Sequence, residues 1–163
     1  MPRRRPVLRE PGVVAATAAL LLTSACGGPL HVDPADAPGD QAKACRRLVA
    51  ALPETVADQP RRDVDPAGST VAAWGDPAIV LRCGVGTPDG FDDLSTCQVT
   101  NGVGWFIPEE QITGEPTEIL MTTVDRTPAV QVRIPREYFP PAAAMVNLAA
   151  AIKQTTVQDD PCL

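Results

Sequence analysis

Five cysteines, several adjacent carboxylates and a small number of arginines are the residues of this sequence that could do chemistry. A cysteine thiolate can be alkylated, oxidised to a disulfide or bound to a metal. Paired carboxylates can cleave glycosidic bonds, and the planar guanidinium of arginine binds carboxylate or phosphate. Nucleophilic catalysis of the Ser-His-Asp or Cys-His kind also needs a histidine. The one histidine, His31, lies in a stretch rich in Pro, Gly and Asp near the start of the chain, so enzymes of that class are not expected.

The first cysteine, Cys26, stands at the end of a segment with the three parts of a secretory signal. Arginines at positions 3, 4, 5 and 9 precede an apolar stretch from Val13 to Leu22, and small residues follow it. Ser24-Ala25-Cys26 resembles the lipobox of bacterial lipoproteins, in which the cysteine thiol receives a diacylglycerol before the signal is removed. We predict that residues 1–25 are a lipoprotein signal peptide and that Cys26, carrying palmitate-type acyl chains, becomes the first mature residue. Two such chains are enough for stable anchoring.

Two other interpretations of this segment remain open. An uncleaved transmembrane helix needs about 20 apolar residues, and the apolar stretch here reaches only about half that length before Gly27-Gly28-Pro29 ends it. Alternatively, Cys26 is an ordinary cysteine of a signal peptide that is cut elsewhere.

The other four cysteines indicate disulfides. An even number of cysteines outside the cytoplasm is typical of a disulfide framework, and four of them allow three connectivities. The chain has no CxxC motif and no complete calcium-loop signature, so we expect no metal and no cofactor. Loop spacing favours Cys83 with Cys97 on adjacent strands, and Cys45 with Cys162 fastening the two ends of the domain.

The composition excludes some partners. The net charge is −6, and the predicted signal removes four arginines but a single glutamate, so the mature chain is more acidic still. Nucleic acids and anionic lipid headgroups both require a basic face, and only 4% of the residues are aromatic. Nucleic acid is therefore not expected as a partner.

The hydrophobic pattern predicts a flexible tether over residues 26–39 and a single α+β domain over residues 40–163. Cys45, Leu48, Val49 and Leu52 mark the buried stripe of a first helix that ends at Pro53, and a second helix follows Pro140-Pro141. We expect an antiparallel sheet of about five strands, covered by the two helices and stapled by two disulfides. The clearest strand segments are 71–74, 79–83, 97–100, 103–107, 118–124 and 129–135.

Several short motifs resemble an actinobacterial family of small exported proteins that is catalogued only as a domain of unknown function. They are Trp74-Gly75, Leu81-Arg82-Cys83-Gly84-Val85, Asn101-Gly102-Val103-Gly104-Trp105, Thr122-Thr123-Val124-Asp125-Arg126 and Val130-Gln131-Val132. The resemblance covers roughly residues 43–155. It implies a location in the cell envelope and a single domain, and it supplies no reaction, ligand or catalytic residue.

Two groups of residues are candidates for a site. Asp92-Asp93 and Glu109-Glu110 offer carboxylate pairs, although both lie in turn-like, solvated segments. Arg82, Trp105 and Arg126 could line a site for an anionic ligand or a peptide. The alternative is structural: Arg82 points to solvent or pairs with Asp125 or Asp76, and Trp105 belongs to the core.

These observations favour a non-catalytic binding or interaction module. We expect it on the extracytoplasmic face of the cell membrane, attached through the lipid on Cys26, with an envelope protein or a small ligand as its partner. Two alternatives remain: a carboxylate-dependent hydrolase of the envelope, and a carrier of apolar envelope lipids. An enzyme would need converging acids in a cleft, and a carrier would need a large dry cavity.

Overall fold

The computed structural model describes residues 1, 28–92, 94–113, 115 and 117–159. The predicted signal peptide, apart from Met1, lies outside the described residues, and so do Cys26 and Cys162. Within the described part of the chain, no helix is long and apolar enough to cross a membrane.

Two α-helices and one large sheet form the domain. The helices are α1 (Gly39–Ala51) and α2 (Ala142–Thr155), and two 3-10 turns, η1 (Glu109–Gln111) and η2 (Arg136–Tyr138), precede β9 and α2. Eight strands make the sheet, in the spatial order β2 (Thr55–Val56), β3 (Gln59–Arg62), β5 (Val71–Trp74), β6 (Ile79–Val85), β11 (Ala129–Ile134), β9 (Ile119–Thr123), β8 (Val103–Phe106) and β7 (Gln98–Thr100). All of these pairs are antiparallel.

Two small ladders complete the topology. β1 (Leu30–His31) pairs in parallel with β4 (Val64–Asp65), and β10 (Arg126–Thr127) pairs with β12 (Val157–Gln158). The predicted combination of two helices with a mostly antiparallel sheet is confirmed. The predicted strand number is wrong, since the main sheet has eight strands rather than about five. β2 and β3 were missed because residues 54–62 are polar and contain proline, which hides the alternation of a short edge hairpin.

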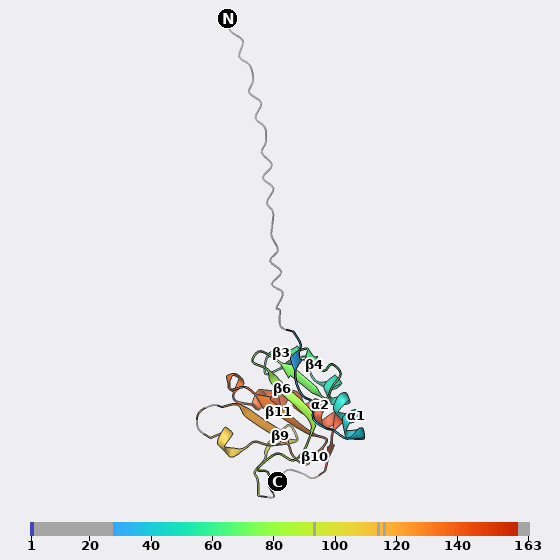
Figure 1. The fold of residues 1–163 in the computed structure, drawn as a ribbon. Coiled ribbons are helices and arrows are strands. Elements are labelled where there is room, and N and C mark those ends of the chain that lie inside the picture. Colours follow the sequence, from blue (N-terminus) through green and yellow to red (C-terminus); the bar gives the residue numbers. More distant parts are fainter. Residues whose placement is uncertain (2–27, 93, 114, 116, 160–163) are drawn as a thin grey trace.

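Both helices cover the same face of the sheet (Figure 1). Alternate residues of the central strands point toward them: Leu81 of β6 and Val132 of β11 are fully buried, and so are Leu48 of α1 and Leu148 of α2. This inner face holds the hydrophobic core. The opposite face, which we call the outer face, carries the intervening residues, among them Val80, Arg82, Leu120, Gln131 and Arg133.

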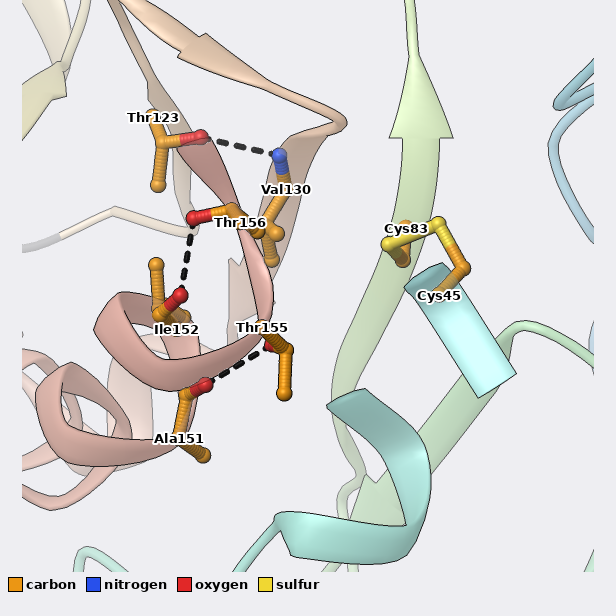
Figure 2. The surroundings of a disulfide bond; sticks show 8 residues. All are labelled: Cys45, Cys83, Thr123, Val130, Ala151, Ile152, Thr155 and Thr156. Atoms are coloured by element: carbon orange, nitrogen blue, oxygen red, sulfur yellow. Dashed lines mark hydrogen bonds between the residues drawn. A yellow bond between two sulfur atoms is a disulfide. The ribbon is translucent and has the colours of Figure 1, made fainter. Parts of the chain in front are cut away.

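A disulfide fastens α1 to the inner face. Cys45 bonds to Cys83 with 5.4 Å between the Cα atoms, and both residues are fully buried (Figure 2). Both predicted pairings, Cys83 with Cys97 and Cys45 with Cys162, are therefore wrong. The buried stripe of α1 places Cys45 directly over β6.

The position of Cys97 explains the first error. It precedes β7, and β11, β9 and β8 lie between β6 and β7 in the sheet. Neighbouring strands are about 4.8 Å apart, so four steps place β7 far beyond disulfide reach of β6. The segments that flank the loop in sequence are not neighbours in the sheet. Cys97 is nevertheless not a free thiol.

Candidate functional site

The three residues predicted to line a ligand site lie in three different environments. Arg82 stands on the outer face of β6, Trp105 is fully buried in β8, and Arg126 is buried at β10. No hollow that the described residues form brings the three together. The sequence prediction of one shared anionic site is not supported by this arrangement.

Trp105 is a core residue. Its side chain belongs to the hydrophobic cluster between sheet and helices, and its indole Nε1 finds no acceptor among the described residues. Trp74 is equally buried, but its Nε1 donates to the Pro53 carbonyl at 3.0 Å, and the Arg61 guanidinium lies 5.8 Å from its ring centre. Both tryptophans therefore stabilise the core. For Trp105, this agrees with the alternative that it is a core residue rather than part of a ligand site.

Arg126 joins three separate parts of the chain. Its guanidinium donates to Thr156 Oγ1 at 3.0 Å, to the Gly102 carbonyl at 3.4 Å and to Gln158 Oε1 at 3.3 Å. These acceptors belong to the end of α2, the turn between β7 and β8, and β12. Desolvation lowers the pKa of Arg126, while the charge of Asp159 acts in the opposite direction. Because both Nη groups of Arg126 donate to acceptors of the protein itself, this residue connects the end of α2, the β7–β8 turn and β12.

Arg82 is one of several arginines on the outer face. Register places Arg82 opposite Gln131, and Arg133 opposite Val80, so Arg82 and Arg133 are diagonal neighbours on adjacent strands. Arg62 of β3 lies in the same cross-strand row as Arg133 of β11, with β5 and β6 between them. Although the chain is acidic overall, three of its arginines therefore lie on this face.

Acidic residues partly balance these arginines. Arg62 lies 3.6 Å from Asp76, and Arg133 lies 3.8 Å from Glu118. Both acids are more than half exposed, so these ion pairs contribute little to stability. Arg82 differs, because its Nε donates to the backbone carbonyl of Asp33 at 3.0 Å.

The segment around Asp33 lies against the protein. We call residues 28–38 the N-terminal strap; they fall within the stretch for which the sequence predicts a flexible tether. The amides of Leu30 and Val32 donate to the carbonyls of Asp63 and Asp65 at 2.9 and 3.0 Å. His31 Nδ1 lies 3.0 Å from Asp65 Oδ2. The strap thus forms the β1–β4 ladder and borders the outer face.

The other end of the strap crosses the sheet at Gly84. This glycine has φ +87°, and a Cβ added there would collide with the Cβ of Ala37 and lie 3.4 Å from Cys45 Sγ. Only a residue without a side chain lets the strap pass so close to β6 before α1 begins at Gly39. Sequence reasoning missed this contact. Gly84 follows Cys83 directly, and a glycine inside a strand pattern is a signal of close backbone approach.

Three of the four predicted carboxylates line one hollow, and the fourth, Asp93, lies outside the described residues. Asp92, Glu109 and Glu110 line about 460 Å³ beside Phe106. Asp92 Oδ1 accepts hydrogen bonds from the Leu94 amide and the Ser95 hydroxyl at 3.0 Å, which makes it a turn-forming residue. The two glutamates are exposed on η1. A general acid needs a carboxyl kept protonated in a dry site, and these exposed positions do not offer that environment.

A second hollow of about 390 Å³ lies at the β10 end of the sheet. It is lined by Gln41 of α1, by the loop at Gly86–Pro88 and by the loop at Asp125–Pro128. Polar side chains such as Thr87 and Asp159 share the lining with apolar ones such as Val85 and Phe91, and the hollow is open to solvent rather than the large dry cavity that a lipid carrier would need. Among the described residues, no cluster of His, Cys, Asp and Glu could hold a metal ion.

The chain belongs to a family of proteins of unknown function, DUF3515, whose model matches residues 11–161. The expected membership of a family catalogued as a domain of unknown function is confirmed. No match to the chain was found among curated proteins or among solved structures.

Proposed function

We propose that this DUF3515 protein is an exported lipoprotein whose domain serves as a non-catalytic binding module at the extracytoplasmic face of the cell membrane. The observation that carries the proposal is the buried disulfide between Cys45 and Cys83. A structural disulfide in the core of a small domain is typical of an oxidising compartment outside the cytoplasm. The basic, apolar and small-residue parts of segment 1–25 supply the matching export signal.

The cysteine count supports lipidation of Cys26. Once Cys45 and Cys83 have bonded to each other, Cys97 and Cys162 remain as the second pair of the domain. Cys26 is then the odd thiol, in the position where the lipobox places a diacylglycerol. The resemblance to small exported proteins of actinobacteria agrees with an envelope location.

The second disulfide is tested by peptide mapping without reduction. Cleavage at aspartates separates Cys83 from Cys97, because Asp89 lies between them. We expect one linked peptide pair that contains Cys45 and Cys83, and another that contains Cys97 and Cys162. A Cys26–Cys97 peptide would contradict both this pairing and the lipidation of Cys26.

Lipidation is tested on the protein expressed in a bacterium with lipoprotein processing enzymes. The tryptic peptide of residues 26–43 should carry a diacylglycerol thioether, and Cys26→Ser should release the protein from membranes or block its processing. Ser24→Ala is the matched control, because it keeps a small residue in the lipobox and should leave membrane attachment unchanged. An unmodified Cys26 together with membrane retention of Cys26→Ser would overturn the proposal.

The hollow at the β10 end is the binding site that fits this proposal best. It is open to solvent, it offers both polar and apolar side chains, and two loops, at Gly86–Pro88 and Asp125–Pro128, contribute to its rim. A photo-crosslinking amino acid at Thr87 should capture a partner in intact cells, whereas the same group at the exposed Arg47 of α1 should not. Equal capture at both positions would argue against a site in this hollow.

A further inference from the structure

We propose that the protein presses one defined end of its sheet, the end around Leu30, against the headgroups of the bilayer that holds it. The inference rests on the proposed lipidation of Cys26 and goes beyond it, because it gives the domain an orientation. The partner is a phospholipid surface, and the recognised chemistry is the headgroup phosphate.

The first argument is the place where the strap becomes fixed. The Leu30 amide donates to the Asp63 carbonyl at 2.9 Å, and the Val32 amide to the Asp65 carbonyl at 3.0 Å. Arg82 Nε holds the Asp33 carbonyl at 3.0 Å from the outer face. These bonds come from two different parts of the domain, so the chain is attached to it from Leu30 onward.

The second argument is the reach of the chain. An extended chain spans at most about 3.5 Å per residue, so the four steps from Cys26 to Leu30 cover no more than about 14 Å. A tether that was free as far as Gly39 would reach about 45 Å by the same measure. Because the strap is bound to the domain, only the segment from Cys26 to Leu30 is free to separate the domain from the membrane. That segment is about three times shorter than a tether that is free as far as Gly39.

The third argument is the chemistry of the surface next to Leu30. A hollow of about 510 Å³ there is lined by Leu30, by three arginines (Arg62, Arg133 and Arg136) and by the three acids that pair with them (Asp76, Glu118 and Glu137). Their acidic partners lie 3.6 to 3.8 Å away in solvent-exposed ion pairs, which are weak. Guanidinium groups in such pairs can exchange a carboxylate for a phosphate, which they bind in the same forked geometry.

The arrangement of the strands then gives the orientation. The described chain enters the domain beside β3 and β4, whereas β10 lies at the opposite end of the molecule (Figure 1). The β5–β6 turn, which contains Asp76, shares the hollow with Leu30 and faces the bilayer. The hollow at Thr87 and Asp125 faces away from it, where a soluble partner can enter.

The test uses the full lipidated chain, reconstituted in nanodiscs of phosphatidylethanolamine and phosphatidylglycerol that contain a gadolinium-chelating lipid. Paramagnetic relaxation should abolish the amide NMR signals of Asp76 and Ala78, and those of Gly86 and Thr127 should persist. A twelve-residue Gly/Ser insert between Gly28 and Pro29 adds about 20 Å of flexible reach without touching a strap contact. It should restore the signals of Asp76 and Ala78.

The matched control carries the same insert after Gly90, in an exposed loop far from the anchor. It should show the wild-type loss of signals. Equal relaxation at both ends of the wild-type domain, or no effect of the insert at Gly28, would overturn the orientation while leaving the lipid anchor intact. A chain that does not associate with the discs at all would overturn the anchor as well.

Discussion

The two faces of the main sheet are held in different ways. On the inner face, two helices pack over fully buried side chains such as Leu81 and Val132, and a disulfide fastens α1 to β6. On the outer face, a short strap is held by a few backbone hydrogen bonds, by the half-buried side chain of Arg82 and by the exposed side chain of His31. Apolar burial contributes far more free energy than exposed polar contacts do. The inner face therefore determines whether the domain folds, and the outer face determines how the N-terminal strap is held.

Removal of the disulfide should produce the largest effect. In Cys45→Ala/Cys83→Ala the unfolded chain regains the freedom of a loop closed over 38 residues, which corresponds to about 4 kcal/mol. We expect a fall of this size in the free energy of unfolding, measured by urea titration. A loss below about 1 kcal/mol would show that the packing of the inner face does not depend on the crosslink.

Replacement of Arg126 should have the next largest effect. Arg126→Met keeps the unbranched apolar stem of the side chain but leaves the Gly102 carbonyl and Thr156 Oγ1 without their donor. We expect a loss of about 1–3 kcal/mol in the free energy of unfolding. Arg47→Met, at an exposed position on α1, is the control and should change stability by less than about 0.5 kcal/mol. Equal effects of the two variants would refute the structural role of Arg126.

A side chain at residue 84 should disturb the crossing of the strap. Gly84→Ala places a Cβ on Ala37 and imposes a positive φ on alanine, for a cost of about 1–3 kcal/mol. Gly86→Ala is the control, since a Cβ there meets nothing within 4 Å. Thermal unfolding of both variants measures the difference. A Gly84→Ala variant as stable as Gly86→Ala would mean that the strap does not pass over β6 in solution.

The smallest effect concerns pH. The hydrogen bond with Asp65 raises the pKa of His31 from 6.5, the charge of Asp33 adds to this shift, and desolvation opposes it. A raised pKa in the folded state means that the contact stabilises the strap fully below pH 6.5 and is lost as the pH rises through the folded-state pKa. Asp65→Ala should lower the His31 pKa toward 6.5 in an NMR titration. An unchanged titration would show that His31 and Asp65 do not pair.

The sequence predicted the parts of this comparison that follow from local pattern. The segments predicted as strands at residues 79–83 and 129–135 are β6 and β11, and the helical stripe correctly placed Cys45 inside. The order of the strands depends on long-range pairing and was missed. β11 and β9 enter the sheet between β6 and β8, which misdirected the cysteine pairing.

The strap was missed for a different reason. Leu30 and Val32 are held through backbone amides, and such bonds leave no pattern of side chains in the sequence. The composition of residues 27–39 indicates a linker, and glycine and proline are equally suited to a docked, irregular segment. In the sequence, only the glycine at position 84 indicates that another backbone segment passes close to this strand. The structure shows that this segment is the strap at Ala37.

Hydrogen exchange at two strap amides tests the central claim most directly. If the strap is docked on the folded domain, the amides of Leu30 and Val32 exchange many times more slowly than in an unfolded chain, because each donates to a carbonyl of the β4 segment. The amide of Leu81, inside the main sheet, serves as the internal reference for a folded domain. Unfolded-chain exchange rates at Leu30 and Val32, beside a protected Leu81, would contradict the docked strap and the membrane orientation that follows from it.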